Sequence, residues 1–556
     1  MSFATEPLLL VLCTIFLVIV FTQNGAVLSV KHSELWFLLF IVYAICKSLL
    51  ANVFDVSSAG YLLFFALLYY GLKSFCSKNN PTNYPIVLLF TTTIILLIYL
   101  FFAVYHYYFK KGALTDFCIP NKSIFSILLA SQIAFALPLV LQYSKATVKP
   151  LRWLFMFIIF TSFILLGCTQ GRSGWLGLML AIIYIVYQNL ANAKTKKIIR
   201  RLLIPFVASV FSFLFLYKPA SSEGRLLIYK VSATIVKDNW LFGIGQGQFK
   251  VQYNEYQAAY FSSHNINSKE ALLADNTFYA FNDFIEVIIE NGVIGFLILA
   301  AAIFLLLKQI SRTETNAANK HLFTASVASL LCIATGSLFS YSLQIFPVIF
   351  QATLCLAIIN SFPFNKNQEF ELGETKTKIA RAVLLSLGVL LLIHFGFYFN
   401  YKNKSNQAFE LKRTGFKQAA REKYGGLYNS YIKDGSTLFQ YAQELYYSNQ
   451  LNKSKEILTN AKKYYCSNEV YKLSAAIEND LQNYAQAERD YKTAICMVPN
   501  RMLSRSELIG FYLERKDSNN AVYWCNSILN MPVKIPSPIT KSIQQKANEI
   551  LAALKK

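Results

Sequence analysis

The chain has 556 residues, of which 55% are hydrophobic and only 15% are charged, and its formal net charge is +23 at pH 7. Soluble proteins carry about 25% charged residues, so this composition excludes an ordinary soluble globular fold and indicates a protein that lies largely in lipid. The positive charges are spread over short loops and form no single basic face, which favours contact with membrane lipid over nucleic acid.

Twelve apolar stretches predict membrane-spanning helices, because a span needs about 20 mainly apolar residues. In chain order they cover residues 7–23, 34–53, 59–76, 85–106, 124–143, 152–168, 173–189, 201–217, 284–307, 322–344, 346–362 and 381–400. Residues 1–6 lack the basic start of a secretory signal, so the first stretch is expected to remain a span. The sequence therefore predicts an all-α, polytopic membrane fold with about 12 transmembrane helices.

Three loops rich in lysine and arginine predict the orientation, because short cytoplasmic loops carry an excess of these residues. The basic residues are Lys194, Lys196, Lys197, Arg200 and Arg201 in the first loop, Lys308, Arg312 and Lys320 in the second, and Lys366, Lys376, Lys378 and Arg381 in the third. With these loops in the cytoplasm, the outer face carries a large loop at 218–283, the connection near 168–173, and everything after residue 400.

Residues 401–556 are more polar and repeat themselves. Ser454, Ala487 and Ala521 occupy one equivalent position at steps of 33 and 34 residues, with aromatic and aliphatic residues recurring around them. This spacing resembles the tetratricopeptide repeat, in which small residues let paired helices approach. The resemblance implies a membrane domain at 1–400 followed by a TPR-like α-solenoid at 401–556, which would bind a peptide or a protein partner.

Neither the cysteines nor the histidines form a metal-binding pattern. The ten cysteines are scattered without CxxC or Cys/His ligand spacing. Of the five histidines, His106 and His394 lie in or beside apolar stretches. The sequence therefore predicts no metal, no cofactor and no disulfide framework.

The first polar motif on the predicted outer side is Gly171-Arg172-Ser173-Gly174, between two apolar stretches. A charge at the bilayer centre costs at least about 2.5–3.5 kcal/mol, so an arginine in such a place is a candidate functional residue, with snorkelling to lipid headgroups as the alternative. The flanking glycines would let a bulky anionic group approach the backbone.

Two further motifs lie in the large loop. Gly224-Arg225 is followed by Lys230, and a glycine-rich run, Leu-Phe-Gly-Ile-Gly, occupies residues 241–245. The run has neither the Lys-Ser/Thr of a P-loop nor the spacing of a dinucleotide-binding fingerprint, so alone it predicts a turn-rich loop near the membrane surface.

The last motif contains Asn282, Glu286 and Glu290, spaced by four so that they share one face of a helix that re-enters the bilayer. Acidic residues are costly in lipid and usually face a cavity. Asp283 stands at the expected start of this helix, where a carboxylate also suits the helix dipole.

These four motifs, in this order, resemble the O-antigen ligase superfamily of ligases, polymerases and protein O-oligosaccharyltransferases of bacterial envelopes. The resemblance covers residues 150–310 and extends to members with a trailing tetratricopeptide domain. It implies an inner-membrane glycosyltransferase that needs no metal. Such an enzyme moves a glycan from a polyprenyl diphosphate to a hydroxyl of lipid A–core or protein on the periplasmic face.

The resemblance also implies roles for individual residues. Arg172 and Arg225 match the arginine positions of the family, and a guanidinium binds phosphate oxygens bidentately. Asn282 and Glu286 belong to the last motif and are expected to be catalytic. The remaining expected contributors to substrate binding are Gly171, Ser173, Lys230, Asp283 and Glu290.

One position departs from the family. Many ligases carry a histidine directly before the asparagine of the last motif, thought to deprotonate the acceptor hydroxyl, and here that residue is Phe281. Phenylalanine accepts no proton, so the base is left open between His264, Asp283, Glu286 and Glu290.

Other functions remain as alternatives. Within the superfamily, ligation, polymerisation and transfer to protein share these motifs. From other classes, a polysaccharide transporter would predict charges deep in several spans, and an envelope scaffold would leave Arg172 and Arg225 without a role.

Overall fold

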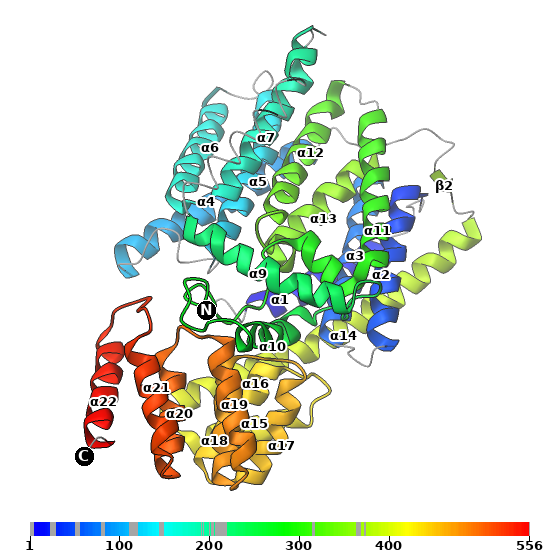
Figure 1. Ribbon diagram of the computed structural model, residues 1–556. Helices are drawn as coiled ribbons and strands as arrows, with labels where there is room; N and C mark the ends of the chain where they lie inside the picture. Colours follow the sequence, from blue (N-terminus) through cyan, green and yellow to red (C-terminus); the bar gives the residue numbers. More distant parts are fainter. Residues whose placement is uncertain are drawn as a thin grey trace.

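The computed structural model describes residues 5–22, 29–50, 56–78, 84–110, 121–143, 149–190, 192, 194–199, 201, 205, 219–313, 317–362, 369–371 and 374–554. Within these ranges the elements are helices, apart from one short antiparallel ribbon that pairs β1 (Ser29–Lys31) with β2 (Glu369–Glu371). The predicted all-α class is confirmed. Figure 1 shows a bundle of long helices above a smaller group of short ones.

Eleven of the twelve predicted spans coincide with helices, whose long apolar runs satisfy their own backbone hydrogen bonds. These helices are α1 (Thr5–Thr22), α2 (His32–Leu50), α3 (Val56–Lys78), α4 (Tyr84–Lys110), α5 (Lys122–Tyr143), α6 (Lys149–Thr169), α7 (Arg172–Asn189), α11 (Asp283–Arg312), α12 (Ala317–Ser337), α13 (Phe346–Ser361) and α14 (Glu374–Arg413), with the short 3-10 helix η1 (Ser342–Gln344) before α13. The predicted span 201–217 falls outside the described residues, except for positions 201 and 205.

Seven of these helices, namely α2 to α6, α11 and α14, are long and apolar enough to cross a membrane, while α1 and α13 are apolar but shorter. The chain is therefore a multi-pass membrane protein, and a count of twelve spans stays a prediction. Helix α5 lies at the centre, with 89% of its apolar window buried, against 17% to 50% for the other six.

Helix α14 joins the membrane bundle to the tail without a break. Its 40 residues run from Glu374 to Arg413, and the turn after it contains Gly415 at a φ of 92°. Left-handed backbone of this kind favours glycine and commonly ends a helix. The predicted boundary at 400 therefore lies inside one continuous helix, and no linker separates the two parts.

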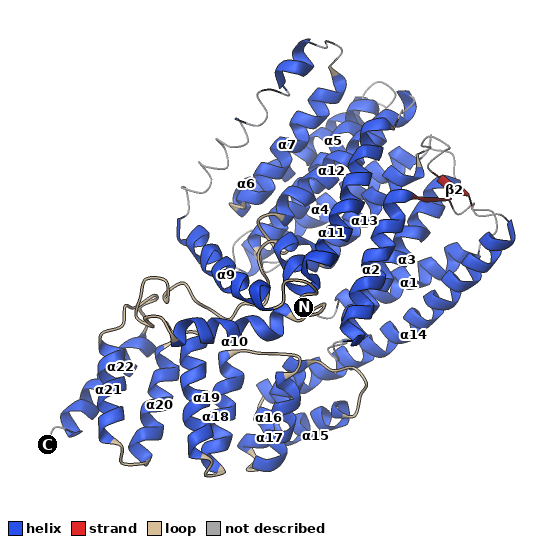
Figure 2. Ribbon diagram, turned by 45° about the vertical axis from the view of Figure 1, so that its right-hand side comes forward, coloured by secondary structure: helices blue, strands red, loops and turns tan. Residues whose placement is uncertain are grey.

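The tail is a series of short helices packed in pairs (Figure 2). They are α15 (Lys417–Tyr428), α16 (Gly435–Tyr447), α17 (Leu451–Lys462), α18 (Asn468–Asp480), α19 (Tyr484–Met497), α20 (Met502–Glu514), α21 (Ser518–Leu529) and α22 (Pro538–Leu554). Helices α16, α18 and α20 begin at 435, 468 and 502, so their starts differ by 33 and 34 residues. The three equivalent small residues are all fully buried at helix contacts. The period is that of a helix pair, and its assignment to the tetratricopeptide class stays a prediction.

The large loop lies between the bundle and the tail (Figures 1 and 2). It contains α9 (Pro219–Asp238) and α10 (Phe249–Ser262), whose apolar faces share a core that includes Val231, Ile235, Tyr253 and Phe261. Helix α10 also packs against α19, and Ala258 joins a buried cluster with residues of the tail. The loop therefore has a fixed place between the other two parts.

Candidate active site

Arg225 lies on α9 beneath an aromatic ring. Its guanidinium carbon is 5.9 Å from the centre of the Phe281 ring, a cation–π distance. One helical turn later, Tyr229 Oη donates to the carbonyl oxygen of Phe281 at 3.4 Å. Because Arg225 and Tyr229 are four residues apart on one helix, they present both groups to the same short segment.

Arg172 is the first residue of α7, at the sharp connection from α6. The amide of Gly171 donates to Thr169 Oγ1 at 3.1 Å, which fixes that connection. A Cβ at Gly171 would lie 2.1 Å from Ser126 Oγ of α5, so only glycine fits this approach. The glycines beside Arg172 therefore allow α7 to pack closely against α5. From the sequence they were instead expected to give a ligand access to the backbone.

A continuous set of contacts runs from Arg225 to Ser173, the residue after Arg172, across three helices. The Phe281 ring meets the Tyr341 ring edge-on at 5.2 Å, and Tyr341 Oη accepts from Asn121 Nδ2 at 3.0 Å. Asn121 also caps α5 at Ser123, whose hydroxyl lies 2.8 Å from that of Ser173. We call Arg172, Arg225, Tyr229, Phe281 and Tyr341 the arginine cluster.

The charge of Arg172 acts electrostatically on Arg225. Burial lowers the pKa of Arg225, and the positive charge of Arg172 lowers that pKa further, while Tyr229 opposes both effects. Arg225 makes no ion pair with any residue that the structure describes. Two like charges held close together at partly buried positions favour an anion between them.

Phe281 and Asn282 form the strained start of α11. Phe281 has a φ of 54°, which is rare for a residue other than glycine. Asn282 Oδ1 accepts from the amides of Phe284 and Ile285, as an N-cap does, and its Nδ2 donates to the carbonyl oxygen of Leu338 at 3.0 Å. The structure thus gives Asn282 a capping contact and brings it beside the arginine cluster through Tyr229.

The three carboxylates of α11 are buried and bind backbone or amide donors. Asp283 Oδ2 accepts from the amide of Leu343 at 3.0 Å, and this hydrogen bond ties η1 to the start of α11. Glu286 accepts from the amide of Ala280 at 2.8 Å and from Gln344 Nε2 at 3.0 Å. Glu290 Oε1 accepts from the amide of Phe249 at 3.1 Å and so caps α10. Asp283 and Glu286 therefore fix segments beside Tyr341 and Phe281, whereas Glu290 fixes the start of α10.

The glycine-rich motif at 241–245 and a second one in α11, Gly-Val-Ile-Gly at 292–295, cross each other backbone to backbone. Helix α11 is broken at Gly292, which has a φ of 66°, and a Cβ there would lie 2.3 Å from the carbonyl oxygen of Leu241. The freed carbonyls of Ile289 and Glu290 accept from the amides of Ile244 and Gly245, at 3.0 and 2.8 Å. Exposed backbone groups at a helix break need such partners. This crossing explains both motifs.

Lys230 and His264 lie apart from the arginine cluster. Lys230 Nζ pairs with Glu270 at 2.6 Å on the surface, and Glu270 also accepts from Tyr260 at 2.8 Å. His264 stacks on Tyr260 with ring centres 4.0 Å apart, and its side chain is exposed. The structure therefore joins these two predicted residues to each other, through Glu270 and Tyr260, and not to Arg172.

Sequence reasoning missed the aromatic part of the cluster. Tyr229 carried a usable signal, because it follows Arg225 by one helical turn. Tyr341 and Asn121 carried none, because they lie far from the motifs in the sequence. In the described part of the chain, no group of three or more His, Cys, Asp and Glu residues could hold a metal ion.

Part of the chain matches a known family. Residues 155–300 match the family described as O-antigen ligase. This range contains Arg172, Arg225, Lys230, Phe281 and all three carboxylates of α11. No curated protein matches the chain.

Proposed function

We propose that the protein is a glycosyltransferase of the O-antigen ligase type. It transfers a glycan from a polyprenyl diphosphate to an acceptor hydroxyl, either of lipid A–core or of a protein, at the periplasmic face of the inner membrane. The family match over residues 155–300 supports glycosyl transfer, and the geometry of the arginine cluster supports the diphosphate donor.

The observation that carries the proposal is the approach of Arg172 and Arg225 at one end of the apolar helices. They come from different helices, α7 and α9, and burial and the positive charge of Arg172 both lower the pKa of Arg225. A diphosphate at this height relieves the repulsion and leaves the polyprenyl chain in lipid. Guanidiniums suit this task because they stay charged and bind phosphate oxygens in pairs.

In the proposed reaction, the bond between the anomeric carbon and the phosphate oxygen breaks as the acceptor oxygen bonds to that carbon. The acceptor hydroxyl gives its proton to a base, for which His264, Asp283, Glu286 and Glu290 are the candidates, and the polyprenyl diphosphate leaves with the bonding electrons. Negative charge therefore grows on the diphosphate, where Arg172 and Arg225 stabilise it. Donors arranged beforehand in this way are worth about 10²–10³ in rate for each group removed.

The Phe281 ring covers Arg225 and keeps it oriented by the cation–π contact. Phe281 occupies the position where many members of the family have a histidine. We assign the proton to no single residue. Glu286, Glu290 and Asp283 each hold a backbone amide, and His264 stacks on Tyr260, so all four candidates have structural partners in their present positions.

The positions of the basic loops support the periplasmic orientation. Helices α7 and α11 end, and α12 begins, at the end of the helix bundle opposite α9, α10 and the tail (Figure 1), and the first two basic loops follow these ends. If the basic end is cytoplasmic, the arginine cluster and the tail both face the periplasm.

The test replaces Arg225 with Ala and with Lys, and Arg172 with Ala, and measures glycan transfer in membranes with equal protein content. We expect transfer to fall about 10²–10³-fold with either Ala, and Arg225→Lys to recover little, because an ammonium does not reproduce the fork. Arg489→Ala, at an exposed site of the tail, is the matched control. Unchanged transfer in Arg225→Ala and Arg172→Ala would overturn the proposal.

A further inference from the structure

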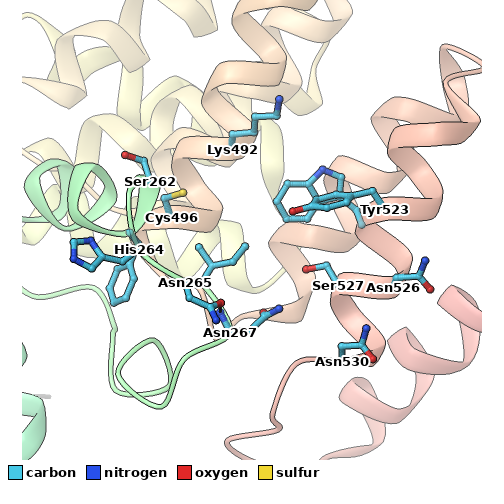
Figure 3. A pocket seen from close by; sticks show the side chains of 13 residues that line it. Ser262, His264, Asn265, Asn267, Lys492, Cys496, Tyr523, Asn526, Ser527 and Asn530 are labelled. Carbon is cyan, nitrogen blue, oxygen red and sulfur yellow. Dashed lines mark hydrogen bonds between the residues drawn. The ribbon is translucent and has the colours of Figure 1, made fainter.

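A cavity of about 630 Å³ lies between the large loop and the tail (Figure 3). One wall comes from the end of α10 and the segment after it, including Phe261, His264 and Asn265, and the other comes from α19 and α21. This volume falls within the range of small-ligand sites. No residue of the arginine cluster lines it, so it is a separate site.

One polar face of α21 lines the cavity. Tyr523, Asn526, Ser527 and Asn530 are spaced by three and four residues, which places them on the same side of the helix. The opposite side, which includes Ala521, packs in the core of the tail. Because the helix is anchored by its apolar side, its polar side is held toward the loop.

Arg505 fixes the two walls to each other. Its side chain is fully buried, and Nη1 donates to Asn267 Oδ1 of the loop at 2.8 Å and to Ser527 Oγ of α21 at 2.6 Å. Nη2 donates to the carbonyl oxygens of Ile266 and Pro499, at 3.2 and 3.0 Å. Both walls therefore meet one guanidinium, and the cavity has a defined shape.

The lining combines aromatic rings with carboxamides. Trp524 is 8% exposed and Tyr523 is 62% exposed. In the described chain, the side-chain amides of Asn526 and Asn530 make no hydrogen bond. Lys492, the one lysine of the lining, is already paired with Glu488 at 2.6 Å. The cavity thus offers rings and amides, with little net charge.

We propose that this cavity binds a segment of the glycan: an oligosaccharide recognised by its hydroxyls and its apolar C–H faces. A carboxamide both donates and accepts, as a sugar hydroxyl does, and an aromatic face covers the apolar side of a sugar ring. An anionic ligand would need unpaired cations, and a helical peptide would need a continuous apolar groove. The inference rests on the proposed function, because that function supplies the glycan.

The route from the cavity to the arginine cluster is short. His264 stacks on Tyr260, Tyr260 binds Glu270, and Glu270 pairs with Lys230 of α9. Lys230 follows Arg225 by five residues, or about 7.5 Å along the helix axis. A glycan of several sugars, attached to a diphosphate at the arginines, extends along this route into the cavity.

The first experiment measures binding without transfer. The probe is the reducing oligosaccharide that mild acid releases from the cell's own polyprenyl diphosphate lipid, added to the full-length protein in nanodiscs and followed by calorimetry. We expect Tyr523→Ala with Asn526→Ala to weaken binding at least 10-fold. The matched control, Tyr447→Ala with Asn452→Ala, changes an equally exposed tyrosine and an exposed asparagine elsewhere on the tail and leaves binding unchanged.

The same probe separates this inference from the proposed function. It lacks the diphosphate, so Arg225→Ala is expected to bind it normally, even if transfer is lost. Equal affinity of the wild-type protein and the Tyr523 double variant would overturn the inference, as would binding of an acceptor peptide but not of the oligosaccharide. Normal transfer by both Arg225→Ala and Arg172→Ala would instead overturn the proposed function, whatever the probe does.

Transfer kinetics identify which glycan enters the cavity. If it is the donor glycan, the Tyr523 double variant raises KM about 10-fold for a donor with many sugars and leaves KM for a single-sugar donor unchanged. If it is the glycan of the acceptor, the increase appears in the KM for the acceptor. In both cases kcat is preserved, and an equal loss for every substrate would contradict a binding role.

Discussion

The arginine cluster and the interface between the loop and the tail use the same residue type in opposite ways. At the interface, Arg505 is completely buried and donates to five oxygen atoms, all from neutral groups. In the cluster, Arg225 has an aromatic ring above it and a second cation nearby. Both Nη atoms of the first guanidinium donate to the protein, whereas the second makes no ion pair in the described chain and is proposed to bind a ligand.

This difference is the one expected between a structural charge and a charge that binds a ligand. A buried charge is tolerated when hydrogen bonds from the protein replace those of water. Burial lowers the pKa of Arg505 to about 10, so the guanidinium stays charged at neutral pH. Asn500 and Arg501 add further contacts across the same interface, to carbonyls of the loop and to Asp275. The tail therefore acts on the loop directly, in addition to any partner it binds.

Replacing Arg505 tests the structural side of the comparison and has the largest expected effect on folding. Arg505→Met leaves buried carbonyls of Ile266, Ser527 and Pro499 without donors, at a cost of about 3–5 kcal/mol. We expect a lower melting temperature and faster hydrogen exchange in residues 263–277 and α21. Arg225→Ala should leave both measurements unchanged. Equal melting of Arg505→Met and wild type would show that the interface contributes nothing to stability.

Gly292 tests the backbone crossing between α11 and the glycine-rich motif at 241–245. Gly292→Ala places a Cβ against the carbonyl of Leu241 and forces a φ that only glycine adopts readily, at a cost of about 3 kcal/mol. We expect reduced thermal stability and a loss of transfer in proportion to the folded fraction. Gly510→Ala, with open space at its Cβ, is the control. A Gly292→Ala protein as stable as wild type would contradict the crossing.

Phe281 tests how the cluster holds Arg225 and has the smallest expected effect. Phe281→Leu keeps apolar cover but removes the cation–π contact, worth about 0.5–1 kcal/mol, so transfer should fall about 2- to 5-fold. The measurement is kcat/KM for the donor, with Phe416→Leu as an exposed control. A loss as large as that of Arg225→Ala would mean that Phe281 has a role beyond orientation.

The sequence predicted much of the fold because lipid imposes a strong pattern. Apolar stretches long enough to span a membrane predicted the helices of the bundle, and small residues at a regular spacing predicted the paired helices of the tail. The spacing of Glu286 and Glu290 correctly placed both on one buried face. Each of these signals is local, so each can be recognised without knowing the tertiary structure.

The rest depended on contacts between distant residues. The glycine motifs at 241–245 and 292–295 explain each other only once the backbone crossing is seen. Tyr341 reaches the arginine cluster from the segment after α12, and Arg505 reaches the loop from α20. The domain boundary at 400 was placed where hydropathy changes, although α14 continues through it because no residue there breaks the helix.

The central claim is that Arg172 and Arg225 together bind a diphosphate. The most direct measurement is the affinity of the full-length protein for geranylgeranyl diphosphate, compared with geranylgeranyl monophosphate, in nanodiscs. We predict that the wild-type protein prefers the diphosphate and that Arg225→Ala and Arg172→Ala each weaken its binding at least 10-fold, while Arg505→Met binds normally once folded. Equal binding of the two lipids by the wild-type protein, or diphosphate binding unchanged in both alanine variants, would contradict the account.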